Sequence, residues 1–251
     1  MVPLWLQAGL WGFAAGSALL IGVAAAYLFD LPQRAIAAVM SLGAGVLISA
    51  LSFELMGNSL HLGGLDSVAV GFITGATAFM VVNFYLSYRG AKYRKRSGDQ
   101  QLSEKEEWGS GFAVAIGSLL DTIPESLVIG LSMLGGRVSF LLVTAVFVSN
   151  LPEGLSSTAG MKKAGRSRTY IFLVWIFVAL ASGISSLAGY WYFRHVSPEV
   201  VAAVSSMAAG TMLVMTADTM FPEAFGEGYE FAGFIAGMGF LAIYALWVFG
   251  W

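Results

Sequence analysis

Apolar stretches of roughly 20 residues recur along nearly the whole chain, separated by short polar segments. A helix of that length rises about 30 Å, the thickness of the hydrocarbon core of a bilayer. The stretches predict eight transmembrane helices, near Leu4–Phe29, Ala35–Gly57, Ser67–Tyr88, Gly109–Leu134, Val138–Gly160, Tyr170–Phe193, Glu199–Phe221 and Tyr229–Phe249. The first stretch lacks a charged leading segment and a small-residue cleavage site, so we interpret it as a span of the mature protein. We expect an all-α integral membrane protein with a single transmembrane domain over residues 1–251.

The composition supports this class and excludes others. The chain of 251 residues is 57% hydrophobic and 11% charged, whereas a soluble domain has about a quarter of its residues charged. A net charge of -2 offers no basic surface for nucleic acid, which we therefore exclude as a partner. The absence of cysteine excludes disulfides and thiolate metal sites. Catalytic triads, phosphate-binding loops and dinucleotide motifs are also absent from the sequence, so we expect neither an enzyme nor a cofactor.

Lysine and arginine are distributed unevenly between the predicted loops. Eleven of the 13 basic residues fall in loops on one side, namely Arg34, Arg89, Lys92, Arg94, Lys95, Arg96, Lys105, Lys162, Lys163, Arg166 and Arg168. Only Arg137 and Arg194 fall on the other side. Because basic loops are retained in the cytoplasm, this asymmetry predicts that both termini lie outside. We expect the polar linker at residues 89–107 to be a cytoplasmic loop with a short surface helix. Its basic residues fit a stop-transfer signal, with binding of anionic lipid as the alternative.

Acidic residues at membrane depth are the main candidates for function. Five lie inside the predicted spans and away from the first residues of a span: Glu54, Asp121, Glu125, Glu153 and Asp218. An ionisable group at this depth costs a few kcal/mol even on lenient insertion scales, so each one is a functional hypothesis. The sequence places no basic residue at a similar depth in these spans.

The fourth and fifth spans share a local pattern, Asp-Thr-Ile-Pro-Glu-Ser-Leu (121–127) and Ser-Asn-Leu-Pro-Glu-Gly-Leu (149–155). Asp121 and Glu125 are four residues apart, as are Ser149 and Glu153, so each pair lies on one helix face. At 1.5 Å per residue from the turn at 135–137, Asp121 is level with Glu153. Glu125 is level with Ser149, near the centre of the bilayer.

Three converging carboxylates without a basic partner would repel one another in a medium of low dielectric. They must be protonated, hydrated or neutralised by a bound cation. Pro124 and Pro152 each remove a backbone hydrogen bond, which frees the carbonyls of Leu120 and Val148 as further oxygen ligands. We predict a divalent-cation site with Asp121, Glu125 and Glu153 as ligands and Asn150 and Ser149 as secondary candidates. The alternative is a pair of proline kinks whose glutamates hydrogen-bond a neighbouring helix.

The second and seventh spans echo each other more weakly. Ser-Leu-Gly-Ala-Gly (41–45) precedes Glu54, and Ser-Met-Ala-Ala-Gly (206–210) precedes Asp218. The two spans cross the membrane in opposite directions, as they would in an inverted repeat that flanks a central helix pair. Simple packing of small residues is the alternative. We expect Glu54 and Asp218 to mark the outer and inner approaches to the site.

The chain resembles the ZIP family of divalent-metal transporters. The resemblance is carried by the two Pro-Glu motifs and by the sequence Met-Thr-Ala-Asp-Thr-Met-Phe-Pro-Glu (215–223) in the seventh span. The resemblance covers all eight spans. It implies a 3+2+3 arrangement of helices with outside termini, a metal site between helices four and five, and movement of the metal toward the cytoplasm as a substrate. A homodimer is one possible assembly of such a protein. We expect the protein in the inner membrane of a bacterial or archaeal cell.

The chain departs from the family pattern at several positions. The family begins its fourth-helix motif with His-Asn, and this chain has Asp121-Thr122; the fifth-helix motif begins with Ser149-Asn150 in place of His or Gln followed by Asn or Asp. The sixth span carries no acid in Ser-Gly-Ile-Ser-Ser-Leu (182–187), which implies a single metal position. An all-oxygen ligand set favours Mn²⁺ or Fe²⁺ over Zn²⁺ relative to the family.

Two further readings stay open beside metal transport. The first is a ZIP-fold protein with a degenerate metal site that serves as a sensor, partner subunit or scaffold, since the motif histidines are missing. The second is transport of protons or of an organic cation, which carboxylates alone can support. His61 and His195 fall in predicted outside loops, where we interpret them as solvated.

Overall fold

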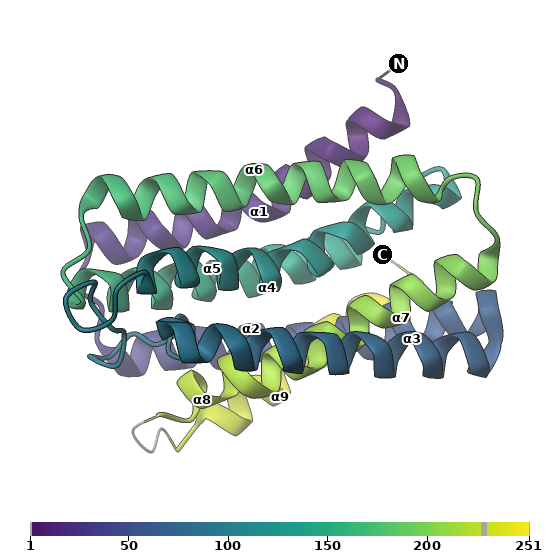
Figure 1. Ribbon diagram of the computed structural model, residues 1–251. Coiled ribbons are helices and arrows are strands. Elements are labelled where there is room, and N and C mark those ends of the chain that lie inside the picture. Colours follow the sequence, from purple (N-terminus) through teal and green to yellow (C-terminus); the bar gives the residue numbers. More distant parts are fainter. Residues whose placement is uncertain (1, 227–229, 251) are drawn as a thin grey trace.

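The computed structural model describes residues 2–226 and 230–250, and the regular elements of this part of the chain are all helices (Figure 1). They are α1 (Leu4–Leu28), α2 (Gln33–Ser49), η1 (Ala50–Met56), α3 (Gly57–Leu86), η2 (Ser87–Ala91), α4 (Ser110–Ser132), η3 (Met133–Gly135), α5 (Phe140–Lys163), α6 (Arg168–Phe193), α7 (Pro198–Met215), η4 (Thr216–Met220), α8 (Phe221–Ala224) and α9 (Ala232–Val248). The all-α prediction is confirmed for the described residues. The predicted start of the last span, Tyr229, lies outside them.

Six helical stretches are long and apolar enough to cross a membrane: Leu4–Leu28, Gln33–Ala91, Ser110–Gly135, Phe140–Lys163, Arg168–Phe193 and Pro198–Ala224. Helix α9 is also apolar but has only 17 residues. Large apolar side chains such as Phe84, Ile184 and Phe234 are exposed on the outer faces of these helices. Exposed apolar surface on this scale fits contact with lipid, so the chain is a multi-pass helical membrane protein.

The 59-residue stretch Gln33–Ala91 is broken at Gly64, whose φ of 71° and ψ of 177° suit glycine and no residue with a side chain. The two arms run along α7 in opposite directions, as their neighbours show: Gly43 near Met220 and Gly63 near Ala202 on the first arm, Gly71 near Ala203 and Asn83 near Asp218 on the second. The chain therefore reverses at Gly64. This turn falls within the polar interval expected between the second and third apolar stretches.

Helices α4 and α5 occupy the middle of the bundle. Figure 1 shows them between α1 and α6 on one side and α2, α3, α7 and α9 on the other. Helix α1 packs closely against α5 because glycines meet backbone there: a Cβ added to Gly154 would lie 2.2 Å from the carbonyl oxygen of Leu19. This placement surrounds both Pro-Glu motifs with protein.

Two helices change their winding next to a predicted functional acid. Glu54 lies in η1 and Asp218 in η4, and both segments are π-helical turns inserted into longer α-helices. Such insertions are rare in proteins, and many of those that are found lie at functional sites. The two acids of the weak sequence echo therefore share an unusual backbone environment as well as a similar sequence position.

The two ends of the bundle differ in polarity. Gln7 and Gly250, close to the two termini, line one cavity together with His61 and Arg137. At the opposite end, ion pairs join basic residues at the end of α5 and in the loop after it to neighbouring acids, namely Lys162 to Asp30, Lys163 to Asp99 and Arg166 to Glu104. The termini and most of the basic residues thus lie at opposite ends.

Candidate functional site

The carboxylates predicted on α4 and α5 are enclosed by the bundle. Asp121, Glu125 and Glu153 are 1%, 0% and 2% exposed. Both helices continue through the prolines of the shared motif, Pro124 and Pro152. Asp121 and Glu153, which the turn count places at one level, are close enough to contact a single ammonium group. The sequence pattern therefore leads to a compact acid cluster in the centre of the molecule.

That ammonium group belongs to Lys95. Its Nζ lies 2.7 Å from Glu153 Oε1 and 3.2 Å from Asp121 Oδ2. Arg94 forms a two-pronged pair with Asp121, in which Nε donates to Oδ2 at 2.9 Å and Nη2 donates to Oδ1 at 2.8 Å. Both basic side chains are almost fully buried. The prediction that the acid cluster has no basic partner was wrong.

The correction follows from the path of the polar linker. Residues 92–109 contain turns and no helix, so the predicted surface helix was also wrong. Instead of lying on the surface, the segment Lys92–Gln101, which we call the docking loop, folds inward against the ends of α4 and α5. Its backbone is held by side chains: Ser156 Oγ donates to the carbonyl of Lys95 at 2.6 Å, and Gln101 Nε2 donates to the carbonyls of Arg94, Arg96 and Ser157. These bonds satisfy backbone groups that a surface helix would have satisfied itself.

Glu223 anchors the same loop from the other side of the bundle. Its Oε1 accepts hydrogen bonds from the backbone N–H and the hydroxyl of Ser97. Its Oε2 lies 3.7 Å from Arg96 Nη1, and Arg96 also donates to the carbonyl of Pro222. The docking loop is therefore fastened to α5 and α8 at once.

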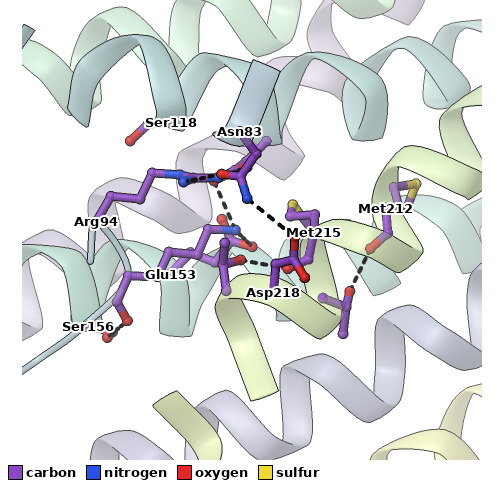
Figure 2. A network of polar contacts seen from close by, with 12 residues as sticks. Asn83, Arg94, Ser118, Glu153, Ser156, Met212, Met215 and Asp218 are labelled. Atoms are coloured by element: carbon purple, nitrogen blue, oxygen red, sulfur yellow. Dashed lines mark hydrogen bonds and ion pairs between the residues drawn. The ribbon is translucent and has the colours of Figure 1, made fainter. Parts of the chain in front are cut away.

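A chain of polar contacts links the acid cluster to Asp218. Arg94 Nη1 donates to Asn83 Oδ1 at 2.8 Å, and Asn83 Nδ2 donates to Asp218 Oδ2 at 3.3 Å. Figure 2 shows Arg94, Asn83 and Asp218 in sequence, with Glu153 beside them. Arg94, Lys95 and Asn83 were not predicted as site residues. Asn83 carried a usable signal, because a lone amide in an apolar span requires a polar partner.

Glu125 differs from the other two acids. Neither of its carboxylate oxygens has a hydrogen-bond partner among the described residues. The secondary candidates are partly committed elsewhere: Ser149 Oγ donates to the carbonyl of Val146 at 3.1 Å, and Asn150 Nδ2 donates to the carbonyl of Ala15 at 3.2 Å. Asn150 Oδ1 is buried and has no partner among the described residues. Glu125 and Asn150 thus retain oxygen atoms that could receive a ligand.

A cavity of about 1110 Å³ opens at the end of the bundle that holds the termini. Glu54 lines it and accepts a hydrogen bond from Ser139 Oγ at 2.7 Å; His61 lines it as well. Val128 and Leu142 form part of its wall, and Val128 lies one helical turn from Glu125. His195 is exposed and is not among the residues lining this cavity. The cavity therefore approaches the acid cluster from the side opposite the docking loop.

Within the described ranges, no group of three or more His, Asp or Glu side chains is arranged to hold a metal ion. The charges of Asp121 and Glu153 are matched instead by Arg94 and Lys95. In this arrangement the cluster can bind a further cation only after the two basic side chains move.

Beyond the docking loop, the linker is anchored by Glu104. This carboxylate accepts hydrogen bonds from the backbone N–H groups of Gly109 (2.7 Å) and Gly111 (2.8 Å) and pairs with Arg166 at 2.7 Å. These donors, Gly109 first, hold the pKa of Glu104 below its usual range. The linker is thereby tied to the start of α4 and to the α5–α6 loop.

Comparison with known proteins adds no assignment. No family model matches the chain, and no curated protein matches it. The resemblance to the ZIP family therefore stays a prediction.

Proposed function

We infer that the protein is an eight-span membrane transporter that carries a divalent cation toward the cytoplasm through the acid cluster of α4 and α5. In this proposal Asp121, Glu125 and Glu153 are the ligands of the transported ion, and Asn150 and Ser149 are secondary ligands. Both termini lie outside, and the basic loops face the cytoplasm. The resemblance of the two Pro-Glu motifs to those of the ZIP family supports this reading.

The observation that carries the proposal is the burial of three carboxylates in the middle of a membrane protein. Such groups are expensive to insert, and they are retained where they serve an ion or proton path. Structural ion pairs would account for Asp121 and Glu153 but not for Glu125, whose oxygens have no partner among the described residues. An incoming cation would complete its coordination.

The surroundings of the acid cluster support a transport path that can be closed separately at each end of the bundle. The large cavity reaches Val128 from the end that holds the termini, whereas the docking loop covers the cluster from the opposite end. A transporter with alternating access needs such a difference between its two sides. The proposal therefore assigns the structure to a state open toward the outside and closed toward the cytoplasm.

The six long apolar stretches and the shorter apolar helix α9 are compatible with eight spans if the stretch Gln33–Ala91 is divided at Gly64. Positive residues concentrate at the end away from the termini, as expected for outside termini. The π-helical turns at Glu54 and Asp218 occur in the two segments proposed as the inverted repeat. We keep these two acids as the outer and inner approaches.

One observation favours a second function. Arg94 and Lys95 form buried ion pairs with Asp121 and Glu153, as expected for a ZIP-like protein whose site has become a structural ion-pair network in a sensor or partner subunit. Transport of protons or of an organic cation is the third reading and relies on Glu125.

Uptake into proteoliposomes separates these functions. Purified protein is tested with Mn²⁺, Fe²⁺, Zn²⁺, Mg²⁺, Ca²⁺ and an organic cation, with and without a pH gradient. Saturable uptake of a divalent metal that is lost in Glu153→Gln supports the proposal. Proton flux without metal supports the third reading, and the absence of any flux supports the second.

A further inference from the structure

We propose that the docking loop is a tethered competitor of the transported cation: the ammonium of Lys95 occupies the position between Asp121 and Glu153 where the cation binds. The cation then gains these two ligands only when the loop leaves. This inference rests on the proposed function and adds to it both a regulatory element and a preference for ion charge.

The distances support mutual exclusion. Lys95 Nζ lies 2.7 Å from Glu153 Oε1 and 3.2 Å from Asp121 Oδ2, and the side chain is 4% exposed. A divalent metal would contact the same carboxylate oxygens at roughly 2.0 to 2.6 Å. The gap between two oxygens cannot hold both an ammonium group and a metal ion, so one displaces the other.

The charges define the exchange. Arg94 and Lys95 bring two positive charges to Asp121 and Glu153, which carry two negative charges. One divalent ion replaces both basic side chains with no change in the net charge of the cluster. A monovalent ion would leave one buried carboxylate uncompensated, which is strongly unfavourable at low dielectric. The exchange therefore selects a divalent cation over a monovalent one.

The backbone of the loop is suited to leave as a unit. Two glycines with positive φ flank the linker, Gly90 (88°) and Gly109 (82°), and such positions at element ends can absorb a change of direction. Within the docking loop the backbone hydrogen bonds are those of single turns, such as the one from the N–H of Arg96 to the carbonyl of Tyr93. Apart from the ion pairs of Arg94 and Lys95, which the incoming cation replaces, the loop is attached through hydrogen bonds of the side chains of Ser156, Gln101 and Glu223. Water can replace these hydrogen bonds one by one.

The first test measures the affinity of Mn²⁺ for the purified full chain by titration calorimetry in nanodiscs. When a tethered group blocks a site, the apparent dissociation constant equals the intrinsic constant divided by the fraction of molecules in which the site is unblocked. We expect Lys95→Gln to lower the apparent Kd about tenfold or more, because minor states are commonly populated at 10% or less. Lys92→Gln makes the same charge change at an exposed position of the same loop and should leave the Kd within about twofold.

The second test keeps Lys95 and follows the loop itself. The natural chain has no cysteine, so Ser97→Cys introduces a single thiol at a buried position and Gln100→Cys introduces one at an exposed position of the same segment. Saturating Mn²⁺ should accelerate maleimide labelling at position 97 at least fivefold. Labelling at position 100 should be fast and should not depend on Mn²⁺.

The outcomes separate the inference from the proposed function. If Mn²⁺ binds and Glu153→Gln abolishes binding, but labelling at position 97 does not change, the transporter proposal stands and the tethered competitor is refuted. An unchanged Kd in Lys95→Gln leads to the same conclusion. If no divalent metal binds to the wild type or to Lys95→Gln, the proposed function fails, and the inference fails with it.

Discussion

The pair of Arg94 and Asp121 allows a quantitative test of how the docking loop is held. Both side chains are 1% exposed, and Arg94 donates two hydrogen bonds to Asp121 and one to Asn83. Replacement of Arg94 by Met leaves the buried carboxylate with only Lys95 as a partner. Removal of one member of a buried ion pair costs about 3 to 5 kcal/mol. For a chain of this size that corresponds to a drop of roughly 6 to 20 °C in the midpoint of thermal unfolding.

The double variant Arg94→Met with Asp121→Leu distinguishes an ion pair from simple packing. Replacement of both members by apolar groups of similar volume is often close to neutral, since no buried charge remains unpaired. We expect each single variant to unfold well below the wild type and the double variant to recover most of the loss. Thermal unfolding in detergent, followed by the elution of monodisperse protein, measures all four forms. Single variants within about 2 °C of the wild type, or a double variant equal to the sum of the singles, would refute a structural role for this pair.

Three further predictions concern the linker, the approaches and the ion preference. Because the pKa of Glu104 is lowered in the folded protein, its carboxylate stabilises the linker above the usual carboxylate pKa, and this stabilisation is lost as the pH falls through the lowered pKa. The protection of residues 99–111 from hydrogen exchange should therefore decrease in acid in the wild type, and it should depend less on pH in Glu104→Gln. Protection of the wild-type linker that does not change as the pH falls would contradict this prediction. Glu54→Gln and Asp218→Asn should each raise the apparent KM for metal uptake more than they lower the maximum rate, and a complete loss of turnover would place either acid in the primary site. Asp121→His should raise the ratio of Zn²⁺ to Mn²⁺ uptake in competition assays by returning a nitrogen ligand, and an unchanged ratio would show that Asp121 does not contact the metal.

The core of the site was accessible from the sequence because its geometry is local. A spacing of four residues places Asp121 and Glu125 on one helix face, and counting from one tight turn matches their depth to that of the fifth span. The long apolar stretches likewise predicted the helical architecture, since length and hydropathy are properties of a single segment.

The basic residues of the site could not be found in this way. Arg94 and Lys95 lie in the most polar part of the chain, where hydropathy assigns every charge to solvent. Their burial depends on partners 26 or more positions away, Asp121 and Glu153, and no local sequence pattern predicts such a pairing. The same tertiary contacts explain the wrong prediction of a surface helix in the linker, because they outweigh the weak helix propensity of a short polar segment.

The π-helical turns at Glu54 and Asp218 could not be predicted from the sequence either. A π-helical turn has no residue preference comparable to the glycine of a left-handed position, so neither η1 nor η4 leaves a signal in the composition. By contrast, the reversal at Gly64 falls inside a predicted interval because the turn needs a glycine and interrupts an apolar run.

Uptake of Mn²⁺ by the Glu125 variant tests the central claim most directly. Glu125 is fully buried, pairs with neither Arg94 nor Lys95 and has no hydrogen-bond partner among the described residues, so Glu125→Gln removes a proposed ligand without breaking a known contact. The matched control is Glu199→Gln, which neutralises an exposed acid at the start of α7. The account predicts that proteoliposomes with Glu125→Gln take up Mn²⁺ at less than about a hundredth of the wild-type initial rate, as expected when about 3 kcal/mol of ligand interaction is lost. Glu199→Gln should keep the wild-type rate, and uptake by Glu125→Gln at the rate of this control would contradict the proposal that the buried acids carry the ion.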